Sequence, residues 1–269
     1  MPLDERAIYL RKLVVRGLAG GGRGHLGPAM SLIEILRVLY DDVLRFDPAN
    51  PAWPGRDRCI LSKGHGCLAL YSLLADKGYF PLDELDTFCR RDSILGGHPE
   101  AGKIPGVEAS TGSLGHGMAI GIGMALAARM DKRDSKVYVV VGDGEINEGS
   151  IWEAALCAGK HRLDNYTVLI DYNKIQASGP TSDIQDLEPL TDKWRSFGFS
   201  VAEVNGHDAV AIRDVLSSLP AGMPHVVICH TTKGKGVSFA ENNPDWHHKA
   251  KIGEKEVSDM LAALDSYHA

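Results

Sequence analysis

The sequence has no run of apolar residues long enough to cross a membrane. Its first residues, Met1-Pro2-Leu3-Asp4-Glu5-Arg6, are charged and lack the apolar core of a signal peptide. The cysteines are odd in number and have no metal-like spacing, so we interpret them as reduced and mostly buried. They stand at positions 59, 67, 89, 157 and 229. Together these absences predict a cytoplasmic protein without a membrane partner.

Lys and Arg are nowhere dense, and the formal net charge is −6, which argues against a nucleic-acid partner. Internal repeats, low-complexity linkers and coiled-coil heptads are absent as well. The hydrophobic share of 44% and the charged share of 24% are those of an ordinary globular protein. We therefore expect residues 1–269 to form one large domain.

The pattern of apolar residues predicts an α/β fold. Strands are expected at 58–62, 137–141, 166–171, 200–204 and 225–230. Helices are expected at 5–18, 28–40, 66–77, 118–130, 149–161, 186–197, 209–218 and 254–266, with Pro28 opening the second of them. Apolar, β-branched strands suit a mostly parallel sheet with helices on both faces. The sequence thus predicts a doubly wound sheet preceded by a long helical section.

Oxygen-bearing side chains follow two of the predicted strands. Gly142-Asp143-Gly144 comes after residues 137–141, and Asn173 comes after residues 166–171. The 28 residues between Gly144 and Asn173 suffice for a crossover helix and a return to a neighbouring parallel strand. Both side chains then meet at the carboxyl edge of the sheet, where a divalent cation and phosphates are expected. Alternatively, Asp143 caps a helix and Asn173 fills a turn.

These residues resemble the motif that binds thiamine diphosphate and magnesium in thiamine-dependent enzymes, although Tyr172 replaces the usual Asn or Asp. Four more segments resemble the signature loops of the transketolase amino-terminal domain, in the same order. They are Gly24-His25-Leu26-Gly27, Leu61-Ser62-Lys63-Gly64-His65, Gly97-His98-Pro99-Glu100 and Thr111-Gly112-Ser113-Leu114-Gly115. The resemblance extends from about residue 10 to residue 250. It implies the fold of the domain that binds the diphosphate of the cofactor.

The resemblance also implies a ligand set. Asp143, Asn173 and the backbone carbonyl of Ile175 would hold Mg²⁺, or Ca²⁺ or Mn²⁺ in its place. The cofactor-binding residues implied are His65, Gly112, Ser113, Leu114, Gly142, Asp143, Gly144, Glu148, Asn173, Ile175 and His247. Ser113 stands where many relatives have Pro. Glu148, together with Glu153, would belong to a carboxylate network at a subunit interface, although carboxylates are favourable at a helix start in any case.

Three histidines, His25, His65 and His98, each lie beside glycine in a loop, where ligands are often bound. Imidazoles that titrate near neutrality suit proton transfer on sugar hydroxyls and carbonyls. The alternative is a coincidence of three loop histidines. The resemblance implies catalytic roles, with His25 and His98 in the substrate channel and His65 near the diphosphate and the reacting carbon.

The segment Trp246-His247-His248 resembles the last active-site loop of the family, which contributes a further catalytic histidine. His247 matches best, but His248 stands where Gly is more common, so the choice between the two stays open. Lys233 and Lys235, on the preceding loop, are interpreted as solvated charges and given no role.

In transketolases a glutamate that activates the cofactor lies in a second, pyrimidine-binding domain, for which this chain has no matching segment. The resemblance therefore implies an α2β2 assembly in which a separate carboxy-terminal subunit supplies that domain. The expected reaction is transfer of a two-carbon ketol unit from a ketose phosphate, such as xylulose 5-phosphate, to an aldose phosphate, such as ribose 5-phosphate. The alternatives are a relative acting on another ketose, a deoxyxylulose phosphate synthase, and a non-catalytic thiamine-binding module.

Overall fold

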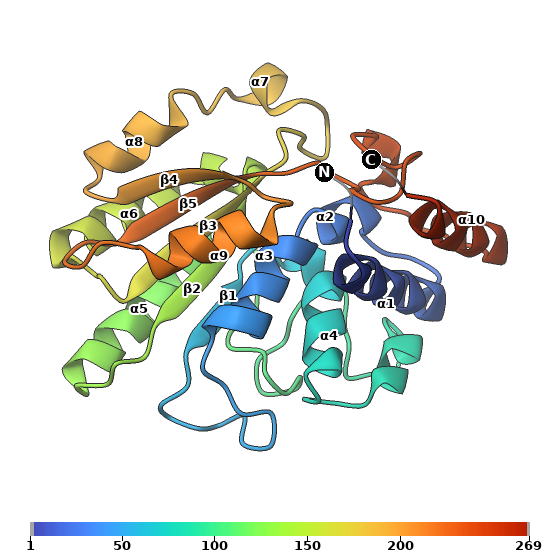
Figure 1. Cartoon of the computed structure of the whole chain (residues 1–269), viewed down its shortest axis with the longest axis horizontal. Coiled ribbons are helices and arrows are strands. Elements are labelled where there is room, and N and C mark those ends of the chain that lie inside the picture. Colours follow the sequence, from blue (N-terminus) through green and yellow to red (C-terminus); the bar gives the residue numbers. More distant parts are fainter. Residues whose placement is uncertain (1–2, 268–269) are drawn as a thin grey trace.

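The computed structural model describes residues 3–267, so Met1, Pro2 and the last two residues of the predicted domain lie outside it. Its centre is a parallel sheet of five strands in the order β1-β2-β3-β5-β4 (Figure 1). The strands are β1 (Arg58–Leu61), β2 (Val137–Gly142), β3 (Tyr166–Tyr172), β4 (Ser200–Asn205) and β5 (His225–His230). All neighbouring pairs are parallel, and Gly142 pairs with Asp171 near the carboxyl edge.

Both faces of the sheet are covered by helices (Figure 1). In β2, Val137, Val139 and Val141 enter one hydrophobic cluster, whereas Tyr138 and Val140 enter the other. The first cluster includes α5 (His116–Met130), α6 (Gly149–His161) and α8 (Leu190–Ser196). The second includes α1 (Glu5–Gly21), α2 (Leu26–Met30), α3 (Ile33–Val38), α4 (Cys67–Asp76), α9 (Ala209–Ser217) and α10 (Glu254–Asp265). The predicted doubly wound α/β class is confirmed.

The predicted helix 28–40 is wrong as one element, because it is divided. Helix α2 begins at Leu26, so Pro28 does not open it, and it ends at Met30. Helix α3 starts at Ile33, and a π-helical turn covers Leu39–Val43. At the break, the Ser31 hydroxyl donates a hydrogen bond of 2.6 Å to the carboxylate of Asp171. This tertiary contact lies outside what helical periodicity can indicate.

The predicted helix 186–197 begins later, at Leu190, after Pro189. A proline disfavours the helical conformation of the residue before it, here Glu188, so residues 186–189 cannot continue into α8. A short helix, α7 (Thr181–Ile184), lies further upstream. Two short 3₁₀ helices, Gly64–Gly66 and Gly144–Asn147, follow β1 and β2.

The sheet order brings several loops to one edge. Lys63 follows β1, Asp143 follows β2, Asn173 follows β3 and Thr231 follows β5. Because the strands are parallel, all four loops lie at the carboxyl edge, the usual ligand-binding edge of an open α/β sheet. Within residues 3–267, no helix combines the length and the apolar character that crossing a membrane requires.

Candidate functional site

A cavity of about 280 Å³ lies among these loops. Its wall includes ten of the residues predicted from the sequence, and six that were not predicted. The predicted ones are His25, His65, Gly112, Leu114, Gly142, Asp143, Gly144, Asn173, Ile175 and His247. The others are Pro28, Lys63, Glu145, Gln176, Ala177 and Lys233. Most of the predicted set is therefore brought together in one place.

Asp143 and Asn173 are both buried and both hold the backbone around them. The Asp143 carboxylate accepts hydrogen bonds from the amides of Gly144 (2.7 Å) and Lys174. Asn173 accepts a bond from the amide of Ile175 through its Oδ1 atom (3.1 Å). The turn-forming roles considered for these residues are thus present, and they orient the same oxygens toward one cavity.

The oxygens of Asp143, Asn173 and Ile175 fit a hard divalent cation. Burial, and then the charge of Asp171, raises the pKa of the Asp143 carboxyl to about 6, so a bound cation would relieve an unfavourable charge. Within residues 3–267 there is no cluster of three or more His, Cys, Asp or Glu side chains able to hold a metal. The predicted ligand set contains only one such side chain, that of Asp143, and the Asn173 amide oxygen and the Ile175 carbonyl oxygen complete it. A set of oxygen ligands suits Mg²⁺ rather than Zn²⁺.

Two buried lysines at the cavity were missed by the sequence analysis. Lys63 donates to Asp171 (2.5 Å), and Lys233 donates to the carbonyls of Ile175 (2.9 Å) and Gln176 (3.1 Å). Burial, and then the charge of Lys63, lowers the pKa of Lys233 to about 8. The interpretation of Lys233 and Lys235 as solvated charges is wrong, because they are 2% and 7% exposed.

Two ammonium groups at one cavity attract an anion. The sequence signal for Lys63 was its place between a predicted strand and His65, and Lys233 likewise follows a predicted strand within three residues. Asp171 partly balances them: burial raises the pKa of its carboxyl, but the Lys63 ammonium and the hydrogen bonds outweigh burial and lower that pKa.

Glu145 is a further buried carboxylate that the sequence analysis passed over. It accepts hydrogen bonds from the Ser62 hydroxyl and from the amides of Gly115 (2.9 Å) and Gly142 (3.1 Å). Burial raises the pKa of its carboxyl. Because these bonds join the ends of β1 and β2 to the loop before α5, Glu145 fixes the wall against which Gly112 and Leu114 lie.

The predicted histidines form a cluster around His25. The centre of its ring lies 5.4 Å from that of His65, 6.5 Å from that of His98, 5.5 Å from that of His247 and 4.5 Å from that of His248. Burial, followed by neighbouring positive charge, lowers the pKa of His25 to about 4 and that of His247 to about 3, and lowers that of His65. These three imidazoles are therefore uncharged at pH 7, and each has one ring nitrogen that can accept a hydrogen bond.

The geometry separates His247 from His248. His247 lies in the cavity wall, 5.5 Å from His65 between ring centres, and its buried Nδ1 has no hydrogen-bond partner within residues 3–267. His248 is exposed and contacts His25 from outside the wall. His98 is also exposed, beside Gly112. The place of His247 fits the histidine implied by the family motif.

Besides the exposed His98, three predicted residues lie away from the cavity wall formed by this chain. Ser113 is exposed between Gly112 and Leu114, and Glu148 and Glu153 are exposed near the start of α6. Gly112 itself requires glycine, since its φ is +143° and an added Cβ would lie 3.1 Å from the His98 ring. A role for Glu148 and Glu153 at an interface stays a prediction.

A parallel α/β sheet with oxygen ligands, ammonium groups and neutral imidazoles at its carboxyl edge defines a cofactor-binding enzyme domain. Comparison with known proteins gives the family. The family model "Transketolase, thiamine diphosphate binding domain" matches residues 4–266. The chain belongs to the transketolase family.

Three relatives are described as transketolase subunits, two of them for apulose 4-phosphate. The apulose-4-phosphate transketolase subunit of Actinobacillus succinogenes is 48% identical over 97% of this chain and 95% of its own length. The 6-deoxy-6-sulfo-D-fructose transketolase subunit of a Clostridium species is 43% identical over 98% of this chain and 96% of its own length. The chain therefore has the extent of such a subunit.

Single-chain transketolases match over a smaller share of their length. Transketolase 2 of Xanthobacter flavus is 37% identical over 97% of this chain but only 40% of its own length. The transketolase structure from Leishmania mexicana superposes with a TM-score of 0.89 at 33% identity, over 97% of this chain and 41% of that one. This chain thus corresponds to the thiamine diphosphate-binding part of a transketolase.

Proposed function

We propose that this chain is the amino-terminal subunit of a split transketolase, which transfers a two-carbon ketol unit between sugars only when a second chain is bound. The observation that carries the proposal is the convergence of Asp143, Asn173, Lys63, Lys233 and neutral histidines on one cavity. The length match to relatives named as subunits supports a separate partner.

In the proposed complex, Asp143, Asn173 and the Ile175 carbonyl hold Mg²⁺, and the Ile175 oxygen retains a second lone pair beside the bond from Lys233. The Lys63 and Lys233 ammonium groups would neutralise the charge of the diphosphate. Thiamine diphosphate, when bound, supplies the nucleophilic carbon that carries the two-carbon unit.

The histidines have separable roles in this proposal. His65 and His247 line the cavity and are uncharged at pH 7, so they would accept hydrogen bonds from sugar hydroxyls near the reacting carbon. His25 lies between them and the exposed His98, so His25 and His98 orient the sugar hydroxyls along the route into the cavity.

The names of the relatives favour a ketose other than xylulose 5-phosphate. Two of them name apulose 4-phosphate, and a third names 6-deoxy-6-sulfo-D-fructose. Like xylulose 5-phosphate, each of these compounds is a keto sugar with an anionic group, but each differs from it in the carbon skeleton or in the anion. We infer that this chain serves an anionic ketose other than xylulose 5-phosphate, with the partner supplying most of the residues that bind the anionic end.

Two features support a partner chain. Ser113 and Glu148, which the resemblance places at the cofactor, are exposed and lie outside the wall of the cavity that this chain forms. Large apolar side chains are also exposed on α5 and α6, the two helices that follow cavity loops, with Ile120 39% and Leu156 61% exposed. We propose that the pyrimidine-binding chain covers this region in an α2β2 assembly and supplies the activating glutamate.

The test begins with a tagged copy of the chain recovered from its host, with bound proteins identified and thiamine diphosphate assayed. We expect a second chain with a pyrimidine-binding domain and stoichiometric cofactor. The complex is then assayed with apulose 4-phosphate, 6-deoxy-6-sulfo-D-fructose and xylulose 5-phosphate as donors, and kcat/KM identifies the preferred class. Turnover by the chain alone, or no cofactor in the complex even with added Mg²⁺, would contradict the proposal.

A further inference from the structure

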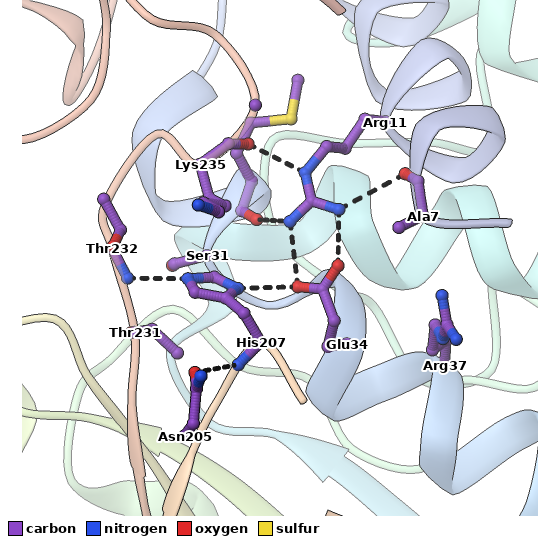
Figure 2. A network of polar contacts seen from close by, with 12 residues as sticks. Ala7, Arg11, Ser31, Glu34, Arg37, Asn205, His207, Thr231, Thr232 and Lys235 are labelled. Carbon is purple, nitrogen blue, oxygen red and sulfur yellow. Dashed lines mark hydrogen bonds and ion pairs between the residues drawn. The ribbon is translucent and has the colours of Figure 1, made fainter. Parts of the chain in front are cut away.

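A buried polar network lies beside the loop that carries Lys233, outside the cavity wall (Figure 2). It joins Arg11 of α1, Glu34 of α3 and His207, which follows β4. The side chains of these residues are 0%, 3% and 6% exposed. Charged groups this deeply buried need all their hydrogen bonds satisfied.

Arg11 uses all five of its N–H donors. Two bonds of 2.6 and 2.9 Å go to the two oxygens of Glu34. The other three go to backbone carbonyls, those of Ala7 (3.3 Å), Met30 (3.1 Å) and Lys235 (2.8 Å). The last of these bonds attaches the loop after β5 to α1.

His207 attaches the same loop at a second point. Its Nε2 atom accepts a hydrogen bond of 2.8 Å from the Thr232 amide, and its Nδ1 atom lies 2.8 Å from a Glu34 oxygen. Because an amide can only donate, Nε2 carries no proton, and Nδ1–H donates to Glu34. Both ring nitrogens are therefore used, Nδ1 as a donor and Nε2 as an acceptor, and Figure 2 shows the two contacts.

These two attachments flank Lys233. Thr232 precedes it and Lys235 follows it by two residues, while the Gly234 amide donates to the Gly27 carbonyl (3.1 Å). The backbone on both sides of Lys233 is thus fixed by groups that do not line the cavity, and its ammonium lies at the Ile175 and Gln176 carbonyls.

We propose that His207 is a positioning residue: together with Arg11 and Glu34, it fixes the Thr232–Lys235 segment so that the Lys233 ammonium faces the cavity. Stability alone is a weak reason to keep such a network, since a buried ion pair often stabilises no more than an apolar pair of similar size. Only the part of the inference that concerns what Lys233 binds rests on the proposed function.

Two substitutions of His207 separate positioning from a general loss of packing. His207→Gln places a carbonyl oxygen near the position of Nε2 and can still accept the Thr232 amide. His207→Asn places its amide near the position of Nδ1, so it keeps the contact to Glu34 and loses the one to Thr232. The two variants differ in the attachment that the proposal requires, and His207→Asn also removes one methylene more than His207→Gln.

The first measurement uses inorganic pyrophosphate with Mg²⁺, titrated calorimetrically into the full chain. We expect His207→Asn to weaken binding about tenfold and His207→Gln by less than about threefold, because only the former frees the Thr232 amide. Lys233→Met should weaken binding at least as much as His207→Asn, and the double variant should bind no more weakly than Lys233→Met alone.

The second measurement needs no ligand. In His207→Asn, hydrogen exchange of amides 231–236 and acetylation of Lys233 by acetic anhydride should both be faster than in the wild type, with His207→Gln close to wild type. If His207→Asn does not fold, Arg11→Lys, which cannot reproduce the five-donor geometry, should show the same two changes.

Equal behaviour of the two His207 variants, or unchanged exchange and acetylation in His207→Asn, would overturn the inference. So would additive losses of binding in the double variant. Absence of pyrophosphate binding by the wild type would count against the proposed function instead, and the exchange and acetylation rates would still decide whether His207 positions Lys233.

Discussion

Replacing Glu34 with Gln removes the only carboxylate that faces the buried Arg11 guanidinium in the described part of the chain. A Gln side chain of the same size offers one acceptor to Arg11 and His207, where Glu34 offered two charged oxygens. Removing one partner of a buried pair costs about 3–5 kcal/mol, because the remaining charge is left uncompensated.

The lowered pKa of Glu34 gives a similar magnitude for the stability that this carboxylate contributes. Burial by itself raises this pKa, but the Arg11 charge and the bonds from His207 and Arg11 outweigh burial and lower it to about 2, from 4.5. A difference of 4.5 − 2 corresponds to roughly 3 kcal/mol of stability. Since the folded pKa is depressed, this stability is present above about pH 4.5 and is lost as the pH falls toward 2.

The assay is urea unfolding of both proteins at pH 7 and pH 4, with thermal scans alongside. At pH 7 we expect Glu34→Gln to be less stable by about 3–5 kcal/mol, which for 269 residues is a drop in Tm of about 5–9 °C. At pH 4 the difference should be about 1 kcal/mol smaller. Glu153→Gln is the matched control, because Glu153 is exposed on α6, and should change stability by less than about 0.5 kcal/mol.

A loss below about 1 kcal/mol at pH 7, or a difference that does not narrow at pH 4, would refute this reasoning. The first result would mean that the folded variant rearranges so that another group, or water, compensates the charge of Arg11. The second result would mean that the pKa of Glu34 does not differ between the folded and unfolded states as its surroundings require.

Three further predictions concern other parts of the chain. Gly121→Ala should lower the free energy of unfolding by about 1–3 kcal/mol in urea titrations, because an added Cβ would lie 2.7 Å from a Val139 methyl group. Gly123→Ala, two residues along the same helix, adds its methyl group in open space and should raise the free energy of unfolding by about 0.5–1 kcal/mol. Equal effects would refute this account of α5 packing. Asp143→Asn should weaken Mg²⁺-dependent thiamine diphosphate binding more than about tenfold in calorimetry, and an unchanged affinity would remove Asp143 from the proposed ligands. The exposed Cys89 should react with a thiol reagent well before the buried Cys59, Cys67 and Cys229. Equal reaction rates would show that local unfolding readily exposes the buried thiols.

The strands were predictable because each is a short apolar run whose side chains alternate between two covered faces, as in β2. Asp143 and Asn173 were predictable as neighbours because parallel strands place their carboxyl ends at one edge. By contrast, the break at Ser31 depends on Asp171, which is 140 residues away, and no local pattern contains that contact.

Lys233 shows why part of the site escaped the sequence analysis. A lysine in a glycine-containing loop looks solvated, and its burial is decided by groups that lie far along the chain. The Gly27 carbonyl, the Ile175 carbonyl and the His207 imidazole all help to place the loop in which it lies. Spacing within the loop carries no trace of these partners.

The bond from Arg11 to the Lys235 carbonyl also has a consequence for synthesis of the protein. It joins residues 224 positions apart. At a translation rate of about 5–20 residues per second, Arg11 is made roughly 10–45 s before the carbonyl that completes its hydrogen bonds. Helix α1 therefore acquires all of its buried hydrogen bonds only after the loop that follows β5 has been made. Its apolar face, with Leu10, Val14 and Leu18, is a surface that a ribosome-associated chaperone would meet during that interval.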